Sequence, residues 1–454
     1  MNERLPMLLL AGACVVALLQ FVVLPGSVVF NEQSVGGQMA ASMEGVSAEV
    51  GWRETLPAQP PLDTRSVIQH VPLPNAVKAI YMSACVAGTP NFRQQLVDLI
   101  NETEVNSVMI DIKDFSGTIA FPVASTSDWY PAWQQAECGA YDMQAFIAEL
   151  HAQNIYVIGR ITVFQDPFYA PLHPEQAVQT TSGEVWRDHK DLSFIDVASQ
   201  DYWQQVVDLS VLSYNLGFDE INFDYIRYPS DGNLDDVYFP QSAAGEYGDD
   251  KQANLEAFFA YLHMQMTDKT NFDLIRHENT GREVSIPWTS ADLFGITTSY
   301  YEDYGIGQVQ ERSAPYFDFI APMVYPSHYT NSFLGGRNPN EYPYEVIYEA
   351  MSDGVARMTA STTSQVGFLH EPIMTTDASG TAEFSGLYTK PAYGLDKFRT
   401  WIQDFDYGGE YTAADVRAQF QASYDAGVDS WMIWAPSNIY TRAALQADSS
   451  TPQE

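Results

Sequence analysis

The sequence predicts an α/β protein, a (β/α)8 TIM barrel with inserted loops. Three observations predict this fold. Eight short β-rich runs recur along the chain, a stretch long enough for a helix follows most of them, and the eighth unit ends the folded region. A doubly wound sheet is the main rival fold, but no Gly-rich phosphate turn follows the first β-rich run.

The predicted strands and helices alternate through the chain. The strands cover residues 77–83, 106–112, 155–161, 220–226, 283–289, 319–325, 398–404 and 430–435. The helices cover Phe92–Ile100, Met143–Gln153, Asp201–Leu216, Asn254–Met266, Tyr344–Met358 and Ala413–Ala426. Residues 365–393 contain several glycines and a short strand-like run of their own, so this segment is predicted to be an inserted hairpin or loop.

Residues 1–30 are predicted to be a transmembrane anchor or a signal peptide. The apolar run Met7–Leu24 has one clearly polar member, Gln20, and is near the shortest length that spans a bilayer. Arg4 precedes the run and the next basic residue is Arg53, so the charge bias places the rest of the chain outside the cytoplasm. No convincing cleavage site follows the run, which favours a membrane-anchored protein over the alternative, a secreted one.

Three further regions differ in composition. Residues 31–75 are rich in Gly, Ala, Ser, Gln and Pro and are predicted to be a flexible stalk. Residues 76–442 form the barrel domain. Residues 443–454 are polar and are predicted to be a disordered tail.

Charge, cysteine and histidine content limit the classes of partner and cofactor. The 454 residues include 22 Lys and Arg against 58 Asp and Glu, a net charge of −36, so a basic nucleic-acid-binding face is excluded. Cys85 and Cys138 either form a disulfide or remain free thiols. The histidines are scattered, and the acidic loop Asp231–Asp236 lacks the Gly and Glu of a calcium loop, so no metal or cofactor is predicted.

Alternation along the strands predicts which side chains face the barrel axis. In the fourth strand these are Glu220, Asn222 and Asp224, and three inward polar groups are costly unless they bond to one another or to a ligand. The neighbouring strands add further charged side chains to the same end of the barrel, namely Asp111, Lys113 and Arg160. Asp114 lies on the loop after the second strand, and Arg227 directly follows the fourth strand. An ion-pair network that only stabilises the barrel is the alternative interpretation.

The last three strands add rings and amides. The inward or rim positions there are Tyr325, His328, Trp401, Gln403 and Trp434. Aromatic rings beside carboxylates and amides are suited to stacking sugar rings and to bonding their hydroxyls, although aromatic residues are also ordinary core material.

Several motifs resemble those of a known family. They include Thr103–Gly117, Ser182–Asp188, Leu216–Gly232, Ser290–Gly295, Ala321–Tyr329, Trp401–Phe405 and Val416–Thr441. With these stretches the chain resembles a bacterial family of extracytoplasmic glycoside hydrolase-like proteins that have an α-amylase-like barrel. The resemblance covers Val77–Thr441 and is most specific at the fourth-strand motif.

The resemblance implies glycosidase chemistry on an extracellular or cell-envelope polysaccharide or oligosaccharide. By similarity to amylase-like barrels, Asp224 takes the nucleophile position and Asp292 the general-acid position, where those enzymes have a Glu. Asp111, Asp114 and Asp404 are reserve carboxylates. Because a Glu is missing after the fifth strand, a noncatalytic glycan-binding or envelope-organising protein on a degenerate barrel is the alternative. The acidic surface favours a neutral glycan as the ligand.

Overall fold

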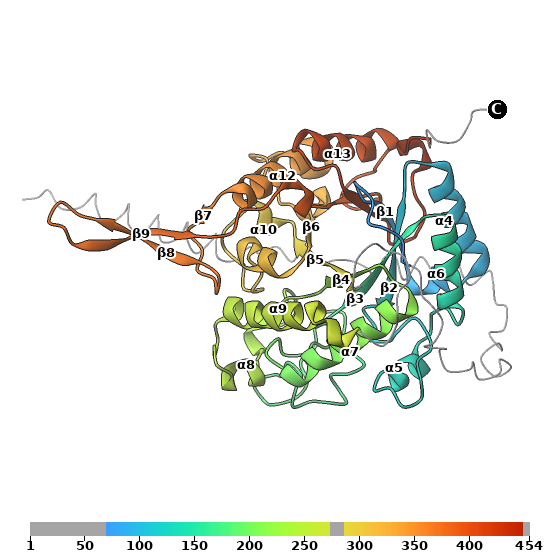
Figure 1. The fold of residues 1–454 in the computed structure, drawn as a ribbon, viewed down its shortest axis with the longest axis horizontal. Coiled ribbons are helices and arrows are strands. Elements are labelled where there is room, and N and C mark those ends of the chain that lie inside the picture. Colours follow the sequence, from blue (N-terminus) through green and yellow to red (C-terminus); the bar gives the residue numbers. More distant parts are fainter. Residues whose placement is uncertain (1–69, 273–285, 448–454) are drawn as a thin grey trace, which may run out of the picture.

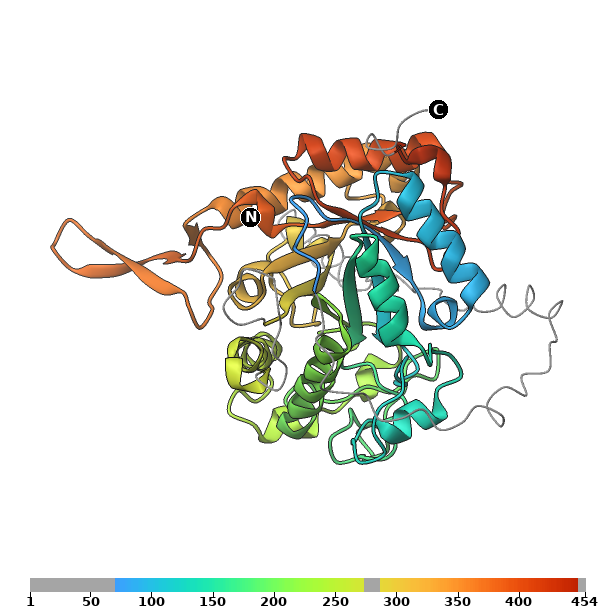
Figure 2. The same ribbon diagram turned by 45° about the vertical axis from the view of Figure 1, so that its right-hand side comes forward.

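The computed structural model describes residues 70–272 and 286–447. Eight parallel strands form one sheet in the order β10-β11-β1-β2-β3-β4-β5-β6. A parallel bridge between Ile320 and Phe398 brings β6 to the start of β10, so the sheet is a nearly closed barrel (Figure 2). The strands are β1 (Lys78–Met82), β2 (Ser107–Lys113), β3 (Tyr156–Thr162), β4 (Glu220–Asp224), β5 (Trp288–Phe294), β6 (Phe319–Met323), β10 (Thr400–Gln403) and β11 (Trp431–Trp434).

Helices surround the strands (Figure 1). The long ones are α4 (Pro90–Glu102), α6 (Met143–Ala152), α7 (Gln200–Leu216), α9 (Lys251–Thr267), α12 (Pro343–Thr359) and α13 (Ala413–Asp425). The short ones are α3 (Ala84–Ala87), α5 (Tyr130–Gln135), α8 (Pro240–Ala244), α10 (Ile296–Ser299) and α11 (Gln310–Ser313). The long helices confirm the six predicted helices to within a few residues at each end.

The fifth strand differs from its prediction. It runs over Trp288–Phe294, whereas residues 283–289 were expected, and residues 283–285 lie outside the described part of the chain. Pro287 cannot donate to a strand ladder, which explains why the strand begins after it. The polar Ser290 and Asp292 therefore lie within the strand instead of in a loop beyond it.

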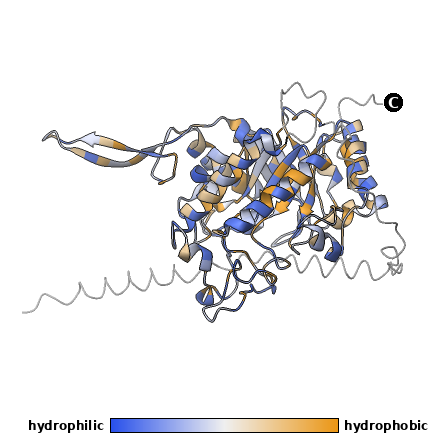
Figure 3. Cartoon of the chain, turned by 60° about the horizontal axis from the view of Figure 1, so that its bottom comes forward, coloured by the Kyte–Doolittle hydropathy of each residue, from blue (hydrophilic) through white to orange (hydrophobic). Residues whose placement is uncertain are grey.

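Two apolar clusters hold the barrel together. The larger one lies between the strands and the helices (Figure 3). The smaller one fills the lumen and consists of Val77, Ala79, Met109, Tyr156, Ile158, Ala321, Met323, Tyr325, Trp401 and Met432. Val71 and Leu73 pack against this lumen cluster, so the interior of the barrel is a packed core.

The predicted insertion is a three-stranded antiparallel sheet. β7 (Thr362–Thr363) and β8 (Glu371–Thr376) both pair with β9 (Ala382–Thr389). β8 and β9 form a long hairpin that projects away from the barrel (Figure 1). The prediction of a hairpin or loop over residues 365–393 is confirmed.

The two ends of the described chain differ from the expected stalk and tail. The backbone N–H of Val71 donates to Asp219, and Gln446 exchanges hydrogen bonds with Glu104, so residues 70–75 and 443–447 pack on the barrel. The predicted anchor and the rest of the stalk and tail lie outside the described residues. Within the described residues, no helix is both long and apolar enough to cross a membrane.

A disulfide joins Cys85 and Cys138, whose Cα atoms are 4.5 Å apart. It closes a loop with a sequence separation of 53 and ties α3, after β1, to the loop before α6. A Cys85→Ser, Cys138→Ser double variant is expected to lose about 2–4 kcal/mol of unfolding free energy, because the reduced chain regains loop entropy when it unfolds. Urea unfolding would measure the loss. An unchanged midpoint would contradict the stabilising role of the disulfide.

Candidate functional site

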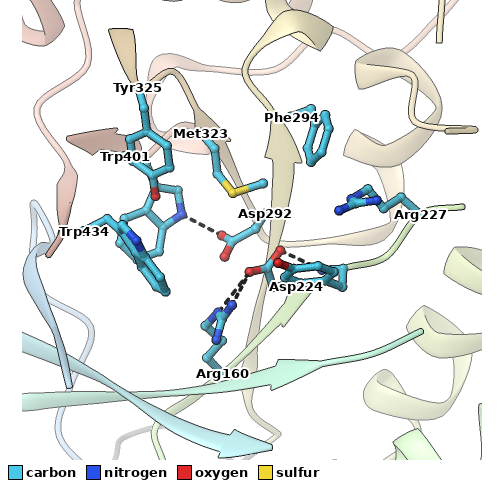
Figure 4. Close-up of a pocket in the computed structure, with 10 residues that line it drawn as sticks. Arg160, Asp224, Arg227, Asp292, Phe294, Met323, Tyr325, Trp401 and Trp434 are labelled. Atoms are coloured by element: carbon cyan, nitrogen blue, oxygen red, sulfur yellow. Dashed lines mark hydrogen bonds and ion pairs between the residues drawn. The ribbon is translucent and has the colours of Figure 1, made fainter. Parts of the chain in front are cut away.

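A pocket lies at the carboxyl ends of the barrel strands (Figure 4). Strands β3, β4, β5, β6, β10 and β11, and the loops that follow some of them, supply its walls. The lining residues are Arg160, Asp224, Tyr225, Arg227, Asp292, Phe294, Met323, Tyr325, Trp401 and Trp434. This is the end of a TIM barrel where active sites are found.

Arg160 joins two carboxylates at the pocket wall. Its Nη2 and Nε donate to Asp224 Oδ2 at 2.6 and 3.0 Å, and its Nη1 donates to Asp111 Oδ1 at 2.8 Å. Burial alone would lower the pKa of Arg160, but Asp224 and Asp111 raise it well above its ordinary value. Asp224 therefore forms a two-donor ion pair with a permanent cation, which fixes its orientation.

Asp111 lies behind the pocket and positions Arg160. Its Oδ2 accepts a hydrogen bond of 2.5 Å from the Tyr81 hydroxyl, and the side chain is fully buried. Burial raises the pKa of Asp111 to about 6, against the opposing effect of Arg160. The Arg160 guanidinium also lies 5.1 Å from the ring centroid of Trp434. This contact and the hydrogen bonds to the two carboxylates together fix the orientation of the guanidinium.

Asp292 has a different environment from Asp224. Its Oδ1 accepts hydrogen bonds of 2.9 Å from Asn222 Nδ2 and from Trp401 Nε1. Its Oδ2 is buried and has no hydrogen-bond partner among residues 70–272 and 286–447. Burial, reinforced by the nearby charge of Asp224, raises the pKa of Asp292 well above its ordinary value. Both effects favour the protonated form of the Asp292 carboxyl.

Below the pocket, the inward polar residues of β4 bond to their neighbours. Asn222 also donates to Ser290 Oγ at 3.0 Å, and Glu220 accepts from Arg399 and, at 3.0 Å, from Tyr156. The prediction that Glu220, Asn222 and Asp224 face the axis is confirmed by these contacts. Two buried atoms of this layer, Asn222 Oδ1 and Arg399 Nη2, have no hydrogen-bond partner among the described residues.

Tyr225, next to Asp224, has a left-handed backbone with φ of 51°. Its N–H donates to Asp224 Oδ1 at 2.6 Å. A non-glycine residue in this region is strained, and such strain is commonly found at functional sites. The turn directs the Tyr225 side chain into the pocket wall immediately after the strand ends.

Seven of the predicted site residues line the pocket, and two more bond to them. The lining residues are Asp224, Asp292, Arg160, Arg227, Tyr325, Trp401 and Trp434, while Asp111 and Asn222 lie directly behind. Four predicted residues do not reach it: Lys113, Asp114, His328 and Gln403.

Lys113 is displaced by a bulge. The register between β2 and β3 shifts between Asp111 and Lys113, which breaks the alternation of side chains. The Lys113 ammonium forms a fully buried ion pair with Asp166 at 3.0 Å and donates to the carbonyl of Thr162 at 2.5 Å. Lys113, predicted to face the lumen and to bind substrate, is thus buried against Asp166 and does not line the pocket.

The other three residues have local structural roles. Asp114 Oδ1 accepts from the backbone and hydroxyl of Ser116 and fixes a turn. Gln403 Oε1 accepts from Ser327 and holds the loop after β6. His328 packs edge-on against Tyr325, with 5.0 Å between the ring centroids, and burial lowers the pKa of His328 to about 3.

Asp404, one of the reserve catalytic carboxylates, accepts two hydrogen bonds from Thr441 and does not line the pocket.

The sequence-based prediction missed four residues of the site. Tyr81 is an inward residue of β1, and its alternation with Ala79 could have indicated its place. Phe294 lies in β5, whose bounds were predicted too early. Met323 was expected to face inward beside Tyr325 but was not included among the substrate-binding residues. Tyr225 follows the end of β4, and nothing in the sequence signals its left-handed backbone.

Metal ligands do not gather in the described part of the chain: no three His, Cys, Asp or Glu side chains there are arranged to hold an ion. The carboxyl groups at the pocket instead pair with Arg160 or accept hydrogen bonds from Asn222 and Trp401.

A family model described as "putative glycosyl hydrolase domain" matches residues 79–375 and 370–440. The chain belongs to this family. The match covers the whole barrel and confirms the resemblance seen in the sequence motifs. A search of curated proteins found no match.

Solved structures also match this glycosyl hydrolase-family chain. A hypothetical protein from Ruminiclostridium thermocellum ATCC 27405 matches at 30% identity over 42% of this chain and 93% of that one, with a TM-score of 0.35. The PgaB (BpsB) glycoside hydrolase domain from Bordetella bronchiseptica matches at 13% identity over 82% and 95%, with a TM-score of 0.49. A class V chitinase from Pseudomonas fluorescens Pf-5 matches at 11% over 81% and 98%, with a TM-score of 0.42. At these TM-scores the matches say nothing about the chemistry of the pocket.

Proposed function

We propose that the protein is a retaining glycoside hydrolase that acts on a polysaccharide outside the cytoplasm. Asp292 is the general acid and Asp224 the nucleophile. The observation that carries the proposal is the contrast between these two neighbouring carboxyls, because glycoside hydrolysis requires one protonated and one ionised group beside the same bond.

The contrast follows from the hydrogen bonds. Arg160 binds one oxygen of Asp224 with two donors, which stabilises the carboxylate. A proton on Asp292 Oδ2 has no acceptor among the described residues until a glycosidic oxygen enters the pocket. Trp401 and Asn222 both hold Asp292 Oδ1, so the rotation of the carboxyl is fixed and Oδ2 is the atom that carries the proton.

The strand register supports retention of configuration. Phe223 of β4 pairs with Ala291 of β5, so Asp224 and Asp292 are the next residues on adjacent parallel strands. Adjacent strands are about 4.8 Å apart. Retaining glycosidases have carboxyl groups about 5–5.5 Å apart, whereas inverting ones need about 6.5–9.5 Å to admit a water molecule.

The full-length chain, tested on a panel of polysaccharides and aryl glycosides, is expected to release sugars whose anomeric configuration equals that of the substrate. Proton NMR at the first minutes of reaction, before mutarotation, would measure the configuration. An inverted first product would refute Asp224 as nucleophile. Binding to a glycan without release of reducing ends from any substrate would instead favour the alternative, a noncatalytic glycan-binding protein, which the short Asp292 side chain in place of Glu supports.

The proposed location outside the cytoplasm rests on the Cys85–Cys138 bond and on the apolar run Met7–Leu24. Disulfides persist in oxidising compartments and are rare in the cytosol. The proposed attachment is one N-terminal membrane helix. Cell fractionation, with protease added to intact cells, would test it, and a barrel protected from the protease would contradict it.

A further inference from the structure

One buried arginine of the pocket has no anionic partner. Six arginines are buried in the described part of the chain: Arg93, Arg160, Arg227, Arg312, Arg357 and Arg399. Five of them form ion pairs with carboxylates at 2.5 to 2.8 Å. The pairs are Arg93 with Asp142, Arg160 with Asp111 and Asp224, Arg312 with Glu256, Arg357 with Glu311, and Arg399 with Glu220. Arg227 forms none with any carboxylate of residues 70–272 and 286–447. Buried charges are normally paired, so Arg227 requires an explanation.

The surroundings of Arg227 hold its guanidinium in a fixed plane. The group lies 4.9 Å from the ring centroid of Tyr225 and 4.5 Å from that of Phe294. Its Nη1 donates to the carbonyl of Tyr228 at 3.0 Å and to Ser230 Oγ at 3.2 Å. Its Nε and Nη2 make no hydrogen bond within the described residues, and Figure 4 shows the guanidinium turned toward the side of the pocket where Asp292 lies.

Arg227 is the pocket cation that no carboxylate of the described residues neutralises by direct contact. Arg160, in contrast, forms ion pairs with both Asp111 and Asp224. Asp224, Asp231 and Asp188 act on Arg227 only at longer range, and burial outweighs them, so that the pKa of Arg227 is lowered. A carboxylate on a bound ligand would supply the direct ion pair that the described residues do not give Arg227.

We propose that Arg227 binds the carboxylate of an acidic sugar, so that the substrate is a glycan containing uronic acid. This inference rests on the proposed function of the same pocket. A planar guanidinium with two free donors matches a carboxylate in a bidentate arrangement. The sugar ring would lie against Trp401, Trp434 and Tyr325, while its carboxylate reaches Arg227 on the opposite wall. The assignment replaces the neutral glycan expected from the acidic composition.

The net charge of −36 does not prevent this binding. At physiological ionic strength, charges separated by more than about 8 Å are largely screened in solvent. A contact at hydrogen-bond distance inside the pocket is screened much less. The acidic surface therefore slows the approach of an anionic polymer, whereas Arg227 determines which sugar is retained.

Binding can be tested without hydrolysis. The full-length protein, its Arg227→Gln variant and its Arg227→Lys variant would be heated with D-glucuronate, D-galacturonate, D-glucose, D-galactose or sodium sulfate at equal ionic strength. We expect at least one uronate to raise the Tm of the wild type by several degrees, with a smaller shift for Arg227→Lys and none for Arg227→Gln. Equal shifts in wild type and Arg227→Gln would overturn the proposal. A shift with sulfate as large as that with a uronate would also overturn it, because the site would then accept any anion.

Kinetics on matched substrates gives a second test. For the wild type, kcat/KM for an aryl glucuronide or galacturonide should exceed that for the corresponding neutral glycoside by at least about 100-fold, the effect of one charged bidentate contact. Arg227→Gln should lose this preference, while the exposed control Arg442→Gln should keep it. A wild type that prefers the neutral glycoside would sink the inference even if Arg227→Gln does not fold. Uronate binding without cleavage of any glycoside would leave the subsite standing and refute the proposed hydrolase function.

Discussion

Replacing Asp224 by alanine is expected to abolish hydrolysis, with kcat/KM falling roughly 10³- to 10⁵-fold on a substrate with a natural leaving group. Asp224 is the proposed nucleophile, and Arg160 orients it through two hydrogen bonds. Without it no group in the described pocket can attack the anomeric carbon from the side opposite the acid. Release of reducing sugar from the substrate identified by the panel would measure the loss.

Azide distinguishes a lost nucleophile from a damaged pocket. With an activated aryl glycoside, azide can enter the space that Asp224 vacates, form a bond to the anomeric carbon and displace the phenol. We expect azide to restore turnover of Asp224→Ala by at least about tenfold and to give a glycosyl azide of inverted configuration. The wild type, in which Asp224 occupies that space, should show no acceleration.

Asp404→Asn is the matched control. Asp404 is another carboxylate at the end of a strand, but it accepts hydrogen bonds from Thr441 and does not line the pocket. The variant should lose some stability and keep its kcat/KM. If Asp224→Asn, with a folded structure by circular dichroism, retained full activity, Asp224 could not be the nucleophile.

The layout of the barrel was predictable because it depends on local patterns. The alternation of side chains in the fourth strand placed Glu220, Asn222 and Asp224 on the axis, and each was found bonded there. The long helices were equally predictable, because their apolar periodicity can be recognised in the local sequence without knowing which segments they pack against. The pairing of Arg160 with Asp111 and Asp224 also followed from adjacent strands that share one face.

The errors arose where the backbone departs from regular geometry. A bulge between Asp111 and Lys113 turns the lysine side chain toward Asp166. Nothing in the residue types at these positions predicts the bulge. Asp292 was placed after the fifth strand because that strand was predicted to end at residue 289. In the structure Asn222 of the adjacent strand β4 donates hydrogen bonds to both Ser290 and Asp292, which accounts for polar residues within β5. Contacts between distant segments, which the sequence does not specify directly, therefore determined the outcome.

Replacing Asp292 by asparagine is expected to stabilise the protein at neutral pH and to inactivate it. Asparagine keeps an oxygen for Trp401 and Asn222 and is neutral at every pH, so folding no longer requires the free energy of protonating a carboxylate at neutral pH. It also has no acidic proton to give, so kcat/KM should fall by about 10²- to 10⁴-fold. Thermal unfolding and the rate on the same substrate would measure the two effects.

The effects of Asp292 on stability and on kcat/KM should both depend on pH, and the raised pKa gives the direction of each. The pKa of Asp292 is raised in the folded state, so between the ordinary carboxyl pKa and the raised one the folded protein binds more protons than the unfolded chain. Wild-type stability then falls as pH rises through this window, by up to about 1.4 kcal/mol per pH unit relative to Asp292→Asn. Wild-type kcat/KM should fall tenfold per pH unit above the raised pKa, where the acid is lost.

Asp219 provides a control of opposite sign. It is also a buried aspartate, and although burial opposes ionisation, hydrogen bonds with His151 and His70 lower its pKa. Its contribution to stability is present above the ordinary carboxyl pKa and is lost as pH falls through the lowered one. Asp219→Asn should therefore destabilise the protein at neutral pH, with a difference from the wild type that shrinks in acid. If Asp292→Asn behaved in the same way, Asp292 would be an ionised structural carboxylate and the acid would have to be another residue.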